Sequence, residues 1–486
     1  MLRNFLRSCR KDGEVWKTLR RNLVAGQPVH ETHPELLQPG EVAPGISTNE
    51  LEERRKKLSQ AIPPKSVAVL SSSDSISVAG IKEPYRQDAN FLYLTGINQQ
   101  AVAVIKNLGT SSSGDGGDHL FILFVPTASE RDQWDGHRLD CEAAKKYFGA
   151  HEAYPMSLLS RQLPSLVRDA SAILFDPTSS TESTGLRYEV KAMLVARALG
   201  GPQPLSHHVQ SLRVKKSPGE IALMRQSALT ASRAMRGCME MTAPGISEHI
   251  LAAHFEYACK LGGAQRLAYP PIVASGPDNC TIHYSRNDKS VKQDDLILMD
   301  AGCDLFGYAS DVTRTWPASG RFSGPQRDLY EVVLATHNKV VNACCPGVSI
   351  KQLHALSINL LSEGLADLGI GRMTSQALVY GHYRKFYPHM IGHFLGLDVH
   401  DTGSIPRASP LAPGSVVAIE PGLYIPDEEE YGYFRGLGIR VEDDVLVTEK
   451  GPMVLSTEVP SEIHEIEKLA SGDHNAQEDT PAAYAC

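Results

Sequence analysis

The chain has 486 residues, of which 42% are hydrophobic and 21% are charged, and this length predicts two or three domains rather than one core. The formal net charge of -8 argues against nucleic acid as the main partner. No apolar run approaches the roughly 20 residues that span a bilayer, so no integral membrane segment is expected. The nine cysteines include no C-x-x-C pair, which favours reduced thiols over a disulfide framework.

Residues 1–26 predict a mitochondrial targeting presequence. The first 21 residues form a basic amphipathic pattern, which is typical of a transit peptide, whereas a secretory signal needs a continuous apolar centre. A surface helix that binds anionic lipid or simply lies in solvent is the alternative. We expect the protein to be located in mitochondria, in the matrix, and its presequence to be cleaved between Arg21 and Gln27. The basic residues are Arg3, Arg7, Arg10, Lys11, Lys17, Arg20 and Arg21, against Asp12 and Glu14.

Residues 27–47 are rich in proline and turn-forming residues and predict an extended lead-in. A smaller α/β domain is predicted over 48–205, because short apolar segments alternate there with helical patterns. Thr48 is the expected cap of its first helix, over 49–60. The apolar, strand-like segments are 67–70, 91–94, 102–105 and 120–125, and the later helical patterns are 142–148, 158–169 and 188–199.

A second domain, with an α+β fold, is predicted over residues 206–470. Ser217 is placed to cap a long helix that Pro218 opens. Residues 471–486 are polar and aperiodic, which predicts a disordered tail. Further helices are expected over 247–261, 325–344 and 350–368, and strands over 271–274, 296–302, 308–316, 416–420 and 439–448.

Four carboxylates of the second domain lie in or at the ends of apolar strands: Asp300, Asp311, Glu420 and Glu442. A carboxylate in such a place is unfavourable unless it is paired or binds a cation. Glycines between Asp300 and Asp311 allow a hairpin that brings these two together. A salt bridge to Arg314 or Arg440 explains any single acid about as well as a functional role does. Four such acids together with a histidine cluster indicate a metal site.

The histidine cluster is the segment P-H-M-I-G-H-F-L-G-L-D-V-H at 388–400, which carries His389, His393 and His400. Imidazole is a common metal ligand and titrates near physiological pH, so this density points to metal binding or proton transfer. A histidine-bearing core segment is the alternative. Gly392 and Gly396 lie between the imidazoles, where they let the backbone come close to whatever the imidazoles bind.

Oxygen ligands with one imidazole suit manganese, cobalt or zinc better than a metal that prefers thiolates. Five ligands are more than one ion needs. Two metal ions about 3.5–4 Å apart that share a water would activate it for hydrolysis. We therefore expect two divalent ions, Mn²⁺ first, with Co²⁺ or Zn²⁺ as alternatives. The sequence has no G-x-S-x-G elbow and no recognisable cysteine-protease signature, which agrees with a hydrolase that lacks a side-chain nucleophile.

Several strings carry a family resemblance: M-D-A-G, S-D-V-T-R-T-W-P, G-H-F-L-G-L-D-V-H-D, I-E-P-G-L-Y and G-I-R-V-E-D-D. They resemble the aminopeptidase P and prolidase branch of the pita-bread dinuclear metallopeptidases. The segment R-Q-D-A-N-F-L-Y-L-T-G at 86–96 is similar to the N-terminal domain of that branch. The resemblance implies a C-terminal pita-bread (creatinase/aminopeptidase-like) catalytic domain after the smaller α/β domain. Residues 26–46 resemble the mitochondrial group of Xaa-Pro aminopeptidase 3 and the intermediate-cleaving aminopeptidase.

The resemblance also implies a set of metal ligands. Asp300 would bind one ion, and His393 and Glu420 would bind the other. Asp311 and Glu442 would bridge the pair.

Further roles come from the same resemblance. His283 would lie near the N-terminal amine or the scissile bond, while His389 and His400 would assist the tetrahedral intermediate and the proline-side carbonyl. Arg440 would orient the site through its acidic neighbours. Glu420 would move the proton between the nucleophilic water and the leaving amine. These roles meet the needs of amide hydrolysis, in which the leaving nitrogen must be protonated and the oxyanion stabilised.

The expected function is therefore metal-dependent hydrolysis of the N-terminal peptide bond. With this function, we interpret Gly392 and Gly396 as room for a peptide beside the metals. The resemblance implies trimming of one residue from imported mitochondrial proteins after presequence cleavage, cleavage of Xaa-Pro N-termini, or both, with peptide or protein N-termini as partners. An Xaa-Pro dipeptidase (prolidase) and a non-catalytic pita-bread binding module are the alternatives. A homodimer or homotetramer is also expected.

Overall fold

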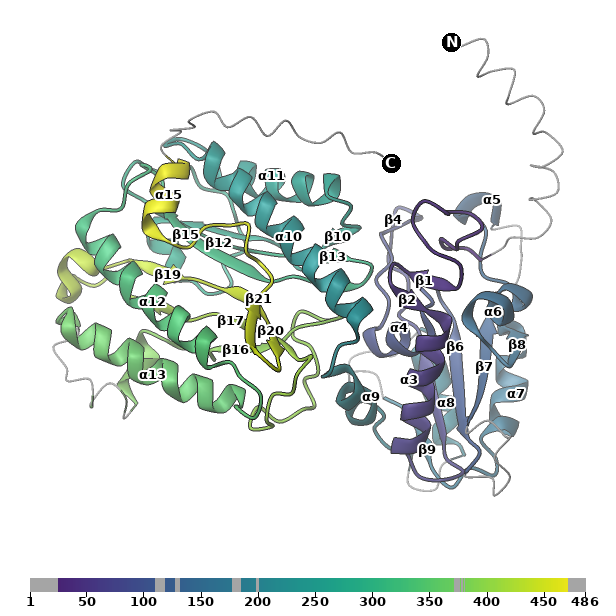
Figure 1. The fold of residues 1–486 in the computed structure, drawn as a ribbon. Coiled ribbons are helices and arrows are strands. Elements are labelled where there is room, and N and C mark those ends of the chain that lie inside the picture. The colour runs from purple at the N-terminus through teal and green to yellow at the C-terminus, as the bar shows by residue number, and fades with distance from the viewer. Residues whose placement is uncertain are drawn as a thin grey trace, which may run out of the picture. The chain divides into compact units, whose positions relative to one another are not determined.

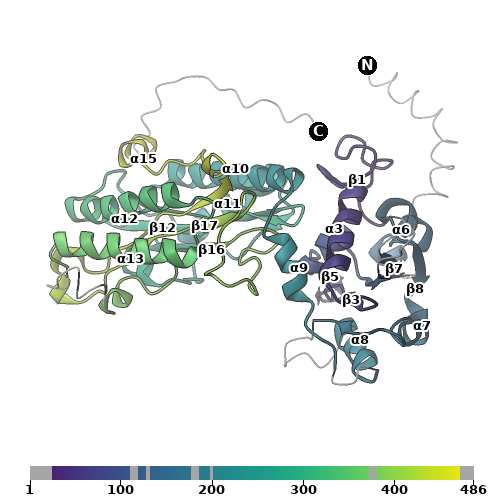
Figure 2. The same cartoon turned by 60° about the horizontal axis from the view of Figure 1, so that its bottom comes forward.

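The computed structural model describes residues 25–470 except 110–118, 127–131, 177–184, 198–200, 371–375, 377–378 and 380. The chain divides into two compact units, the first ending at Leu212 and the second beginning at Arg213 (Figures 1 and 2). All but the last two residues of the predicted presequence, and the whole predicted tail, lie outside the described residues. No helix among the described residues is long and apolar enough to cross a membrane.

The first unit is built on a five-stranded sheet in the order β8-β7-β6-β3-β9. The pairs β3–β9 and β7–β8 are parallel, and the other two pairs are antiparallel. Buried residues run almost without interruption along the three central strands, as expected when both faces of a sheet are covered. The strands are β3 (Val67–Ser71), β6 (Val102–Asn107), β7 (His119–Val125), β8 (Glu152–Pro155) and β9 (Ile173–Leu174).

Two small hairpins and a set of helices complete this part of the chain. The hairpins are β1 (Glu41–Ala43) with β2 (Ile46–Ser47), and β4 (Ser77–Val78) with β5 (Ile81–Lys82). The helices are α3 (Thr48–Ala61), α4 (Ala89–Thr95), α5 (Asp132–Asp135), α6 (Cys141–Phe148), η1 (Met156–Leu158), α7 (Leu159–Leu166), α8 (Leu186–Val195) and α9 (Ser206–Arg213).

Two local predictions in the first unit are wrong. The cap of α3 is Ser47 rather than Thr48, because the Ser47 side chain accepts a hydrogen bond from the Glu50 amide. The segment 91–94 is not a strand but part of α4, which Asp88 caps and Gly96 ends in a left-handed conformation. Nearly every side chain of α4 is buried, so its sequence lacks the polar positions that reveal helical periodicity.

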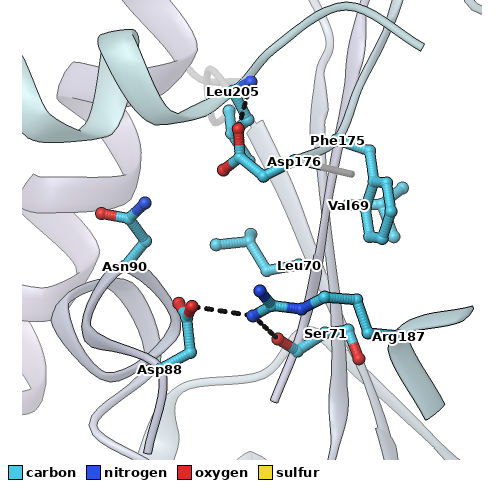
Figure 3. A pocket seen from close by; sticks show the side chains of 9 residues that line it. All are labelled: Val69, Leu70, Ser71, Asp88, Asn90, Phe175, Asp176, Arg187 and Leu205. Carbon is cyan, nitrogen blue, oxygen red and sulfur yellow. Dashed lines mark hydrogen bonds and ion pairs between the residues drawn. The ribbon is translucent and has the colours of Figure 1, made fainter. Parts of the chain in front are cut away.

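A small cavity lies in this unit beside the ends of β3 and β9 (Figure 3). Arg187 crosses it and donates to Asp88 Oδ2 at 2.7 Å and to the Ser71 carbonyl at 3.3 Å. The cavity has a volume of about 20 Å³, which gives room for roughly one water molecule. The cavity is therefore too small for a peptide substrate.

The second unit combines long helices with several antiparallel sheets. The sheets are β11-β12-β15, β10-β13-β14, β16-β17-β20-β21 and β18-β19. The strands are β10 (Arg266–Leu267), β11 (Ile272–Ser275), β12 (Leu296–Ala301), β13 (Cys303–Leu305), β14 (Tyr308–Ala309), β15 (Val312–Pro317), β16 (Gly392–Phe394), β17 (Val416–Ile419), β18 (Gly422–Tyr424), β19 (Gly438–Arg440), β20 (Asp443–Thr448) and β21 (Gly451–Val454). The helices are α10 (Pro218–Met241), α11 (Glu248–Leu261), η2 (Gly276–Cys280), α12 (Gly324–Ala343), α13 (Ile350–Asp367), η4 (His382–Lys385), η5 (Glu429–Phe434) and α15 (Ile463–Ala470).

Two pairs of long helices cover the strands of this unit, and residues of α12 and α13 belong to both of its large buried clusters (Figure 1). Buried side chains of α10 and α11 pack with those of β11, β12 and β15 in the main core. Buried side chains of α12 and α13 pack with those of β16, β17 and β20 in a second cluster. As predicted, Ser217 caps α10 and Pro218 opens it, and Glu220 completes a capping box. The two helix pairs thus fix two groups of strands whose ends carry the predicted ligands.

Two predicted strands are interrupted at a predicted ligand. The strand expected over 308–316 splits into β14 and β15, and Asp311 lies in the gap. The strand expected over 439–448 splits into β19 and β20, and Glu442 lies in that gap. Similarly, Glu420 directly follows β17. These breaks free the carboxylates from the regular alternation of a strand, so they can converge on a common point.

Candidate metal centre

The first two acids meet across the pair β12–β15, in which Ala301 lies opposite Val312. Asp300 lies on β12 and Asp311 directly precedes β15. The Tyr269 hydroxyl oxygen is 2.5 Å from an oxygen of each carboxylate. Because a phenol has one proton, Tyr269 donates to one acid at a time. A buried hydroxyl thus ties the two acids together.

The other strand group brings in the imidazole and a third acid. His393 lies on β16, which is antiparallel to β17, and the Glu420 amide donates to the Ile391 carbonyl at 2.8 Å. His393 Nε2 is 3.4 Å from Asp311 Oδ2 and 3.8 Å from Glu420 Oε1. Its Nδ1 donates to the carbonyl of Phe394 at 3.0 Å. This bond fixes the tautomer that leaves Nε2 available to a metal.

Glu442 completes the group from a third direction. Its amide donates to the Thr313 carbonyl at 3.0 Å, and the Thr313 hydroxyl donates to Glu442 Oε2 at 2.6 Å. Ligand atoms of Asp311, His393 and Glu442 all lie within 4.8 Å of one another. Asp300 joins this group through Tyr269, and Glu420 joins it through His393. The structure therefore brings all five predicted ligands together, although the first and the last are 142 residues apart in the sequence (442 − 300).

The charges of this group fit divalent cations. Burial and the neighbouring acids raise the pKa of Glu442 well above its usual value. Burial raises the pKa of Asp300, and it raises that of Glu420 to about 7 although His393 and Arg440 oppose the shift. Four neighbouring carboxylates, each at least half-buried, cannot all remain ionised without added positive charge. Two divalent ions would supply it, and four carboxylates with one imidazole suit hard or borderline ions.

Arg440 lies against this group and is buried. Its Nη2 donates to Asp300 Oδ2 at 2.6 Å, and its Nη1 donates to the Tyr424 hydroxyl at 2.7 Å. Its Nε donates to the Thr313 hydroxyl at 3.1 Å. One guanidinium therefore orients Asp300 directly and Glu442 through Thr313.

A chain of hydrogen bonds leads from Arg440 to His389. The Tyr424 hydroxyl accepts from Arg440, so it donates to His389 Nε2, which lies 2.9 Å away. His389 Nδ1 donates to the Met390 carbonyl at 2.7 Å. Burial and the charge of Arg440 lower the pKa of His389 to about 3. His389 is therefore neutral near pH 7, which agrees with its accepting a proton from Tyr424.

The two remaining predicted histidines are exposed. The rings of His400 and His393 have centroids 4.4 Å apart, in an edge-to-face arrangement. His283 lies close enough for its charge to lower the pKa of both His389 and His400. Its loop is fixed by the buried Glu248, which accepts hydrogen bonds from Tyr284, Ser275 and the Lys289 amide.

Sequence reasoning missed four residues of this centre. Tyr269 and Tyr424 hold the acids and His389, and Thr313 holds Glu442, as described above. Asp444 is buried and accepts from the Asp311 amide at 3.3 Å. The two consecutive acids of R-V-E-D-D after Glu442 could have signalled Asp444, because a strand rarely buries them without a partner. Tyr269 follows a two-residue strand, and no periodicity marks it.

The interpretation of Gly392 and Gly396 as room for a peptide is wrong. A Cβ atom on Gly392 would lie 1.8 Å from the carbonyl oxygen of Ala418, and one on Gly396 would lie 2.5 Å from Asp401 Oδ2. The missing side chains let β16 pair with β17 and let the Asp401 carboxylate approach the loop. Both glycines serve packing.

We expect Gly392→Ala to lower the free energy of unfolding by about 3 kcal/mol, since the added methyl group must displace main chain. Urea denaturation measures this change. Gly403→Ala is the control, because no atom lies within 4 Å of the methyl group it adds, and it should stay within about 0.5 kcal/mol of the parent. Unchanged stability of Gly392→Ala with reduced turnover would restore the peptide-room interpretation.

Comparisons with known proteins agree with this centre. Residues 222–449 match the model of metallopeptidase family M24, and residues 51–175 match that of the aminopeptidase P N-terminal domain. The chain is 40% identical over 449 residues to the mitochondrial intermediate cleaving peptidase 55 of Arabidopsis thaliana, covering 91% of this chain and 87% of that protein. It is 37% identical over 465 residues to Xaa-Pro aminopeptidase 3 of Mus musculus, covering 93% and 91%.

A solved structure shares the fold. It is the Zn-substituted aminopeptidase P of Escherichia coli in complex with product, with a TM-score of 0.81 and 31% sequence identity. The similarity covers 89% of this chain and 100% of that chain.

Proposed function

Because the chain belongs to the aminopeptidase P family of M24 metallopeptidases, we propose that it removes single N-terminal residues from imported mitochondrial proteins after presequence cleavage, from Xaa-Pro N-termini, or from both. Metallo-aminopeptidase activity follows from the family. The mitochondrial substrates are the proposal. The observation that carries the chemistry is the convergence of four carboxylates and His393 in one centre, with Asp311 and Glu442 buried and the other three half-buried.

We assign the ligands in the way that the family resemblance implies. Asp300 would hold one divalent ion, His393 and Glu420 would hold the other, and Asp311 and Glu442 would contact both. The two Asp311 oxygens support this assignment, since one faces Tyr269 and Asp300 while the other faces His393. Mn²⁺ is the proposed metal, with Co²⁺ and Zn²⁺ as alternatives, because the donors are mostly carboxylate oxygens. Divalent ions at this site would supply Lewis-acid polarisation of the scissile carbonyl and activation of the attacking water.

The chain's own residues supply proton transfer and orientation. The Glu420 side chain is 20% exposed and lies 3.6 Å from His389, so it faces both the buried centre and the accessible side. This position supports its role in carrying a proton from water to the leaving nitrogen. Both ring nitrogens of His389 are engaged, so a role on substrate requires Nδ1 to leave the Met390 carbonyl. The exposed His283 and His400 are accessible to substrate.

The mitochondrial part of the proposal rests on two observations. Residues 1–21 are strongly basic and amphipathic, and the similar protein from Arabidopsis thaliana carries the word mitochondrial in its name. A fluorescent reporter fused to residues 1–30 should enter the mitochondrial matrix. A reporter that stays in the cytosol would contradict this localisation.

The peptidase assay separates the candidate functions. With Mn²⁺ supplied, the protein should release the first residue from Xaa-Pro-Yaa peptides and from Tyr-headed or Leu-headed peptides longer than two residues. Mass spectrometry detects each shortened product. Cleavage of Xaa-Pro dipeptides alone would replace the proposal by a dipeptidase, and no cleavage of any peptide would favour a binding module.

A further inference from the structure

A buried ion cluster lies next to His400 and is not part of the metal centre. Arg213 donates to Asp398 Oδ2 at 2.9 Å and to Asp401 Oδ1, and Lys216 donates to Asp401 Oδ2 at 3.1 Å. The side chains of Arg213, Lys216 and Asp401 are at most 3% exposed. Burial alone would raise the pKa of the Asp401 carboxyl, but the two cations hold it below its usual value. Buried ion pairs add little net stability, so a positional role has to be considered.

The cluster closes the loop that carries His400. The Asp401 amide donates to the Phe394 carbonyl at 2.9 Å, and the Gly396 amide donates to the Asp398 carbonyl at 3.1 Å. The Asp401 carboxylate occupies the space that a side chain at position 396 would need. Because the loop folds back on itself, His400 returns beside His393, and this explains the 4.4 Å between their ring centroids.

The same loop contains a strained residue. Thr402 has φ of 50°, a left-handed conformation that β-branched residues rarely adopt. Its hydroxyl is buried and has no hydrogen-bond partner among the described residues. Each such feature costs about 1–3 kcal/mol and persists only where the surroundings enforce it. Arg213 and Lys216 bind the adjacent Asp401, and these bonds can hold Thr402 in its strained conformation.

We propose that Arg213 and Lys216 are positioning residues for His400. Their ion cluster with Asp401 holds the strained 394–402 loop in the conformation that sets the His400 ring beside His393. The inference rests on the proposed function for the role of His400 on substrate. A purely structural cluster would act on stability or on metal content, whether or not His400 is present.

A double-mutant cycle tests the proposal. Lys216→Met and the milder Arg213→Lys are each made with His400 present and with His400→Ala. With His400 present, Lys216→Met should lower kcat about 10–100-fold at unchanged metal content, the size of a lost supporting contact. With His400→Ala, the same change should alter kcat less than about 2-fold. Lys215→Met is the matched control, because Lys215 is adjacent in sequence and exposed.

Hydrogen exchange of the 394–402 peptide gives a second readout that needs no substrate. Lys216→Met should speed exchange of this peptide about 10-fold or more, and Lys215→Met should not, because loss of the cluster lets the loop open locally. Unchanged exchange, or an equal loss of kcat with and without His400, would overturn the inference. If Lys216→Met fails to fold, the same two measurements on Arg213→Lys, namely the dependence of its kcat on His400 and the exchange of the 394–402 peptide, test the inference. A parent protein without peptidase activity would refute the proposed function, while exchange would still decide whether the cluster holds the loop.

Discussion

Replacing a proposed bridging ligand, in Asp311→Asn or Glu442→Gln, is expected to lower kcat on the order of 10³-fold or more, a loss of about 4 kcal/mol in transition-state stabilisation. These changes keep the side-chain shape but remove the negative charge that would hold both ions. Metal content should fall in parallel, as measured by inductively coupled plasma mass spectrometry on the purified variants.

The fold should survive these replacements. Burial and the surrounding acids raise the pKa of the Glu442 carboxyl, so a neutral amide at this position removes a desolvated charge and its repulsion in the metal-free protein. Asp427→Asn is the matched control, because Asp427 is 53% exposed and pairs with Arg435 away from the centre. Full activity and full metal content in Asp311→Asn or Glu442→Gln would refute the bridging assignment.

Removing the metal is expected to abolish activity and to make stability fall as pH rises from 5 to 9. In the metal-free protein the pKa of Glu420 is raised from its ordinary 4.5 to about 7, chiefly by burial. The pKa of His393 is raised from 6.5 to about 9, because Asp311 and Glu420 outweigh burial. A raised folded-state pKa contributes stability that is present below the unfolded value and lost as pH rises through the folded value.

Urea unfolding at pH 5, 7 and 9 after chelation measures this slope. Between pH 5 and pH 9 the free energy of unfolding should drop on the order of 3 kcal/mol, which is the energy that corresponds to a pKa shift as large as that of Glu420. Added Mn²⁺ should restore activity and reverse the trend, because metal binding requires deprotonated ligands. His389, whose pKa burial and Arg440 lower to about 3, opposes the trend between pH 5 and 6.5, but its effect is smaller than that of Glu420 and His393 together. Asp443, whose pKa is lowered mainly by Arg314, loses its contribution only in more acidic solution. A metal-free protein that gained stability towards pH 9 would contradict the charge arrangement described here.

The chemistry of the centre could be predicted from particular positions in the sequence. Asp300 and Glu420 stand out because each follows a run of apolar strand residues, where a carboxylate needs a partner. The family resemblance then supplied the grouping, the fold class and the peptidase activity, and the relatives confirm the family and the fold. Most helix and strand positions in the second unit also followed from periodicity and caps, as at Ser217.

What the sequence could not reveal depends on contacts between distant segments. Tyr269 joins Asp300 and Asp311 only because a loop folds over both strands. The sequence predicts that Gly392 makes room for substrate. In the structure, the atom that a side chain there would meet first is the Ala418 carbonyl oxygen of the paired strand. Similarly, Asp401 reads as part of a histidine motif, and only the fold brings Arg213 to it from 188 positions away.

This chain is an aminopeptidase P-like metallopeptidase, and we propose that its activity depends on a pair of ions held by the five converging ligands. The most direct measurement titrates the metal-free protein with Mn²⁺ and follows both bound metal per chain and release of the first residue from an Xaa-Pro-Yaa peptide. We predict that activity rises with bound metal to a plateau at two ions per chain. Full activity without bound divalent metal would contradict the account, as would two bound ions with no release of the N-terminal residue.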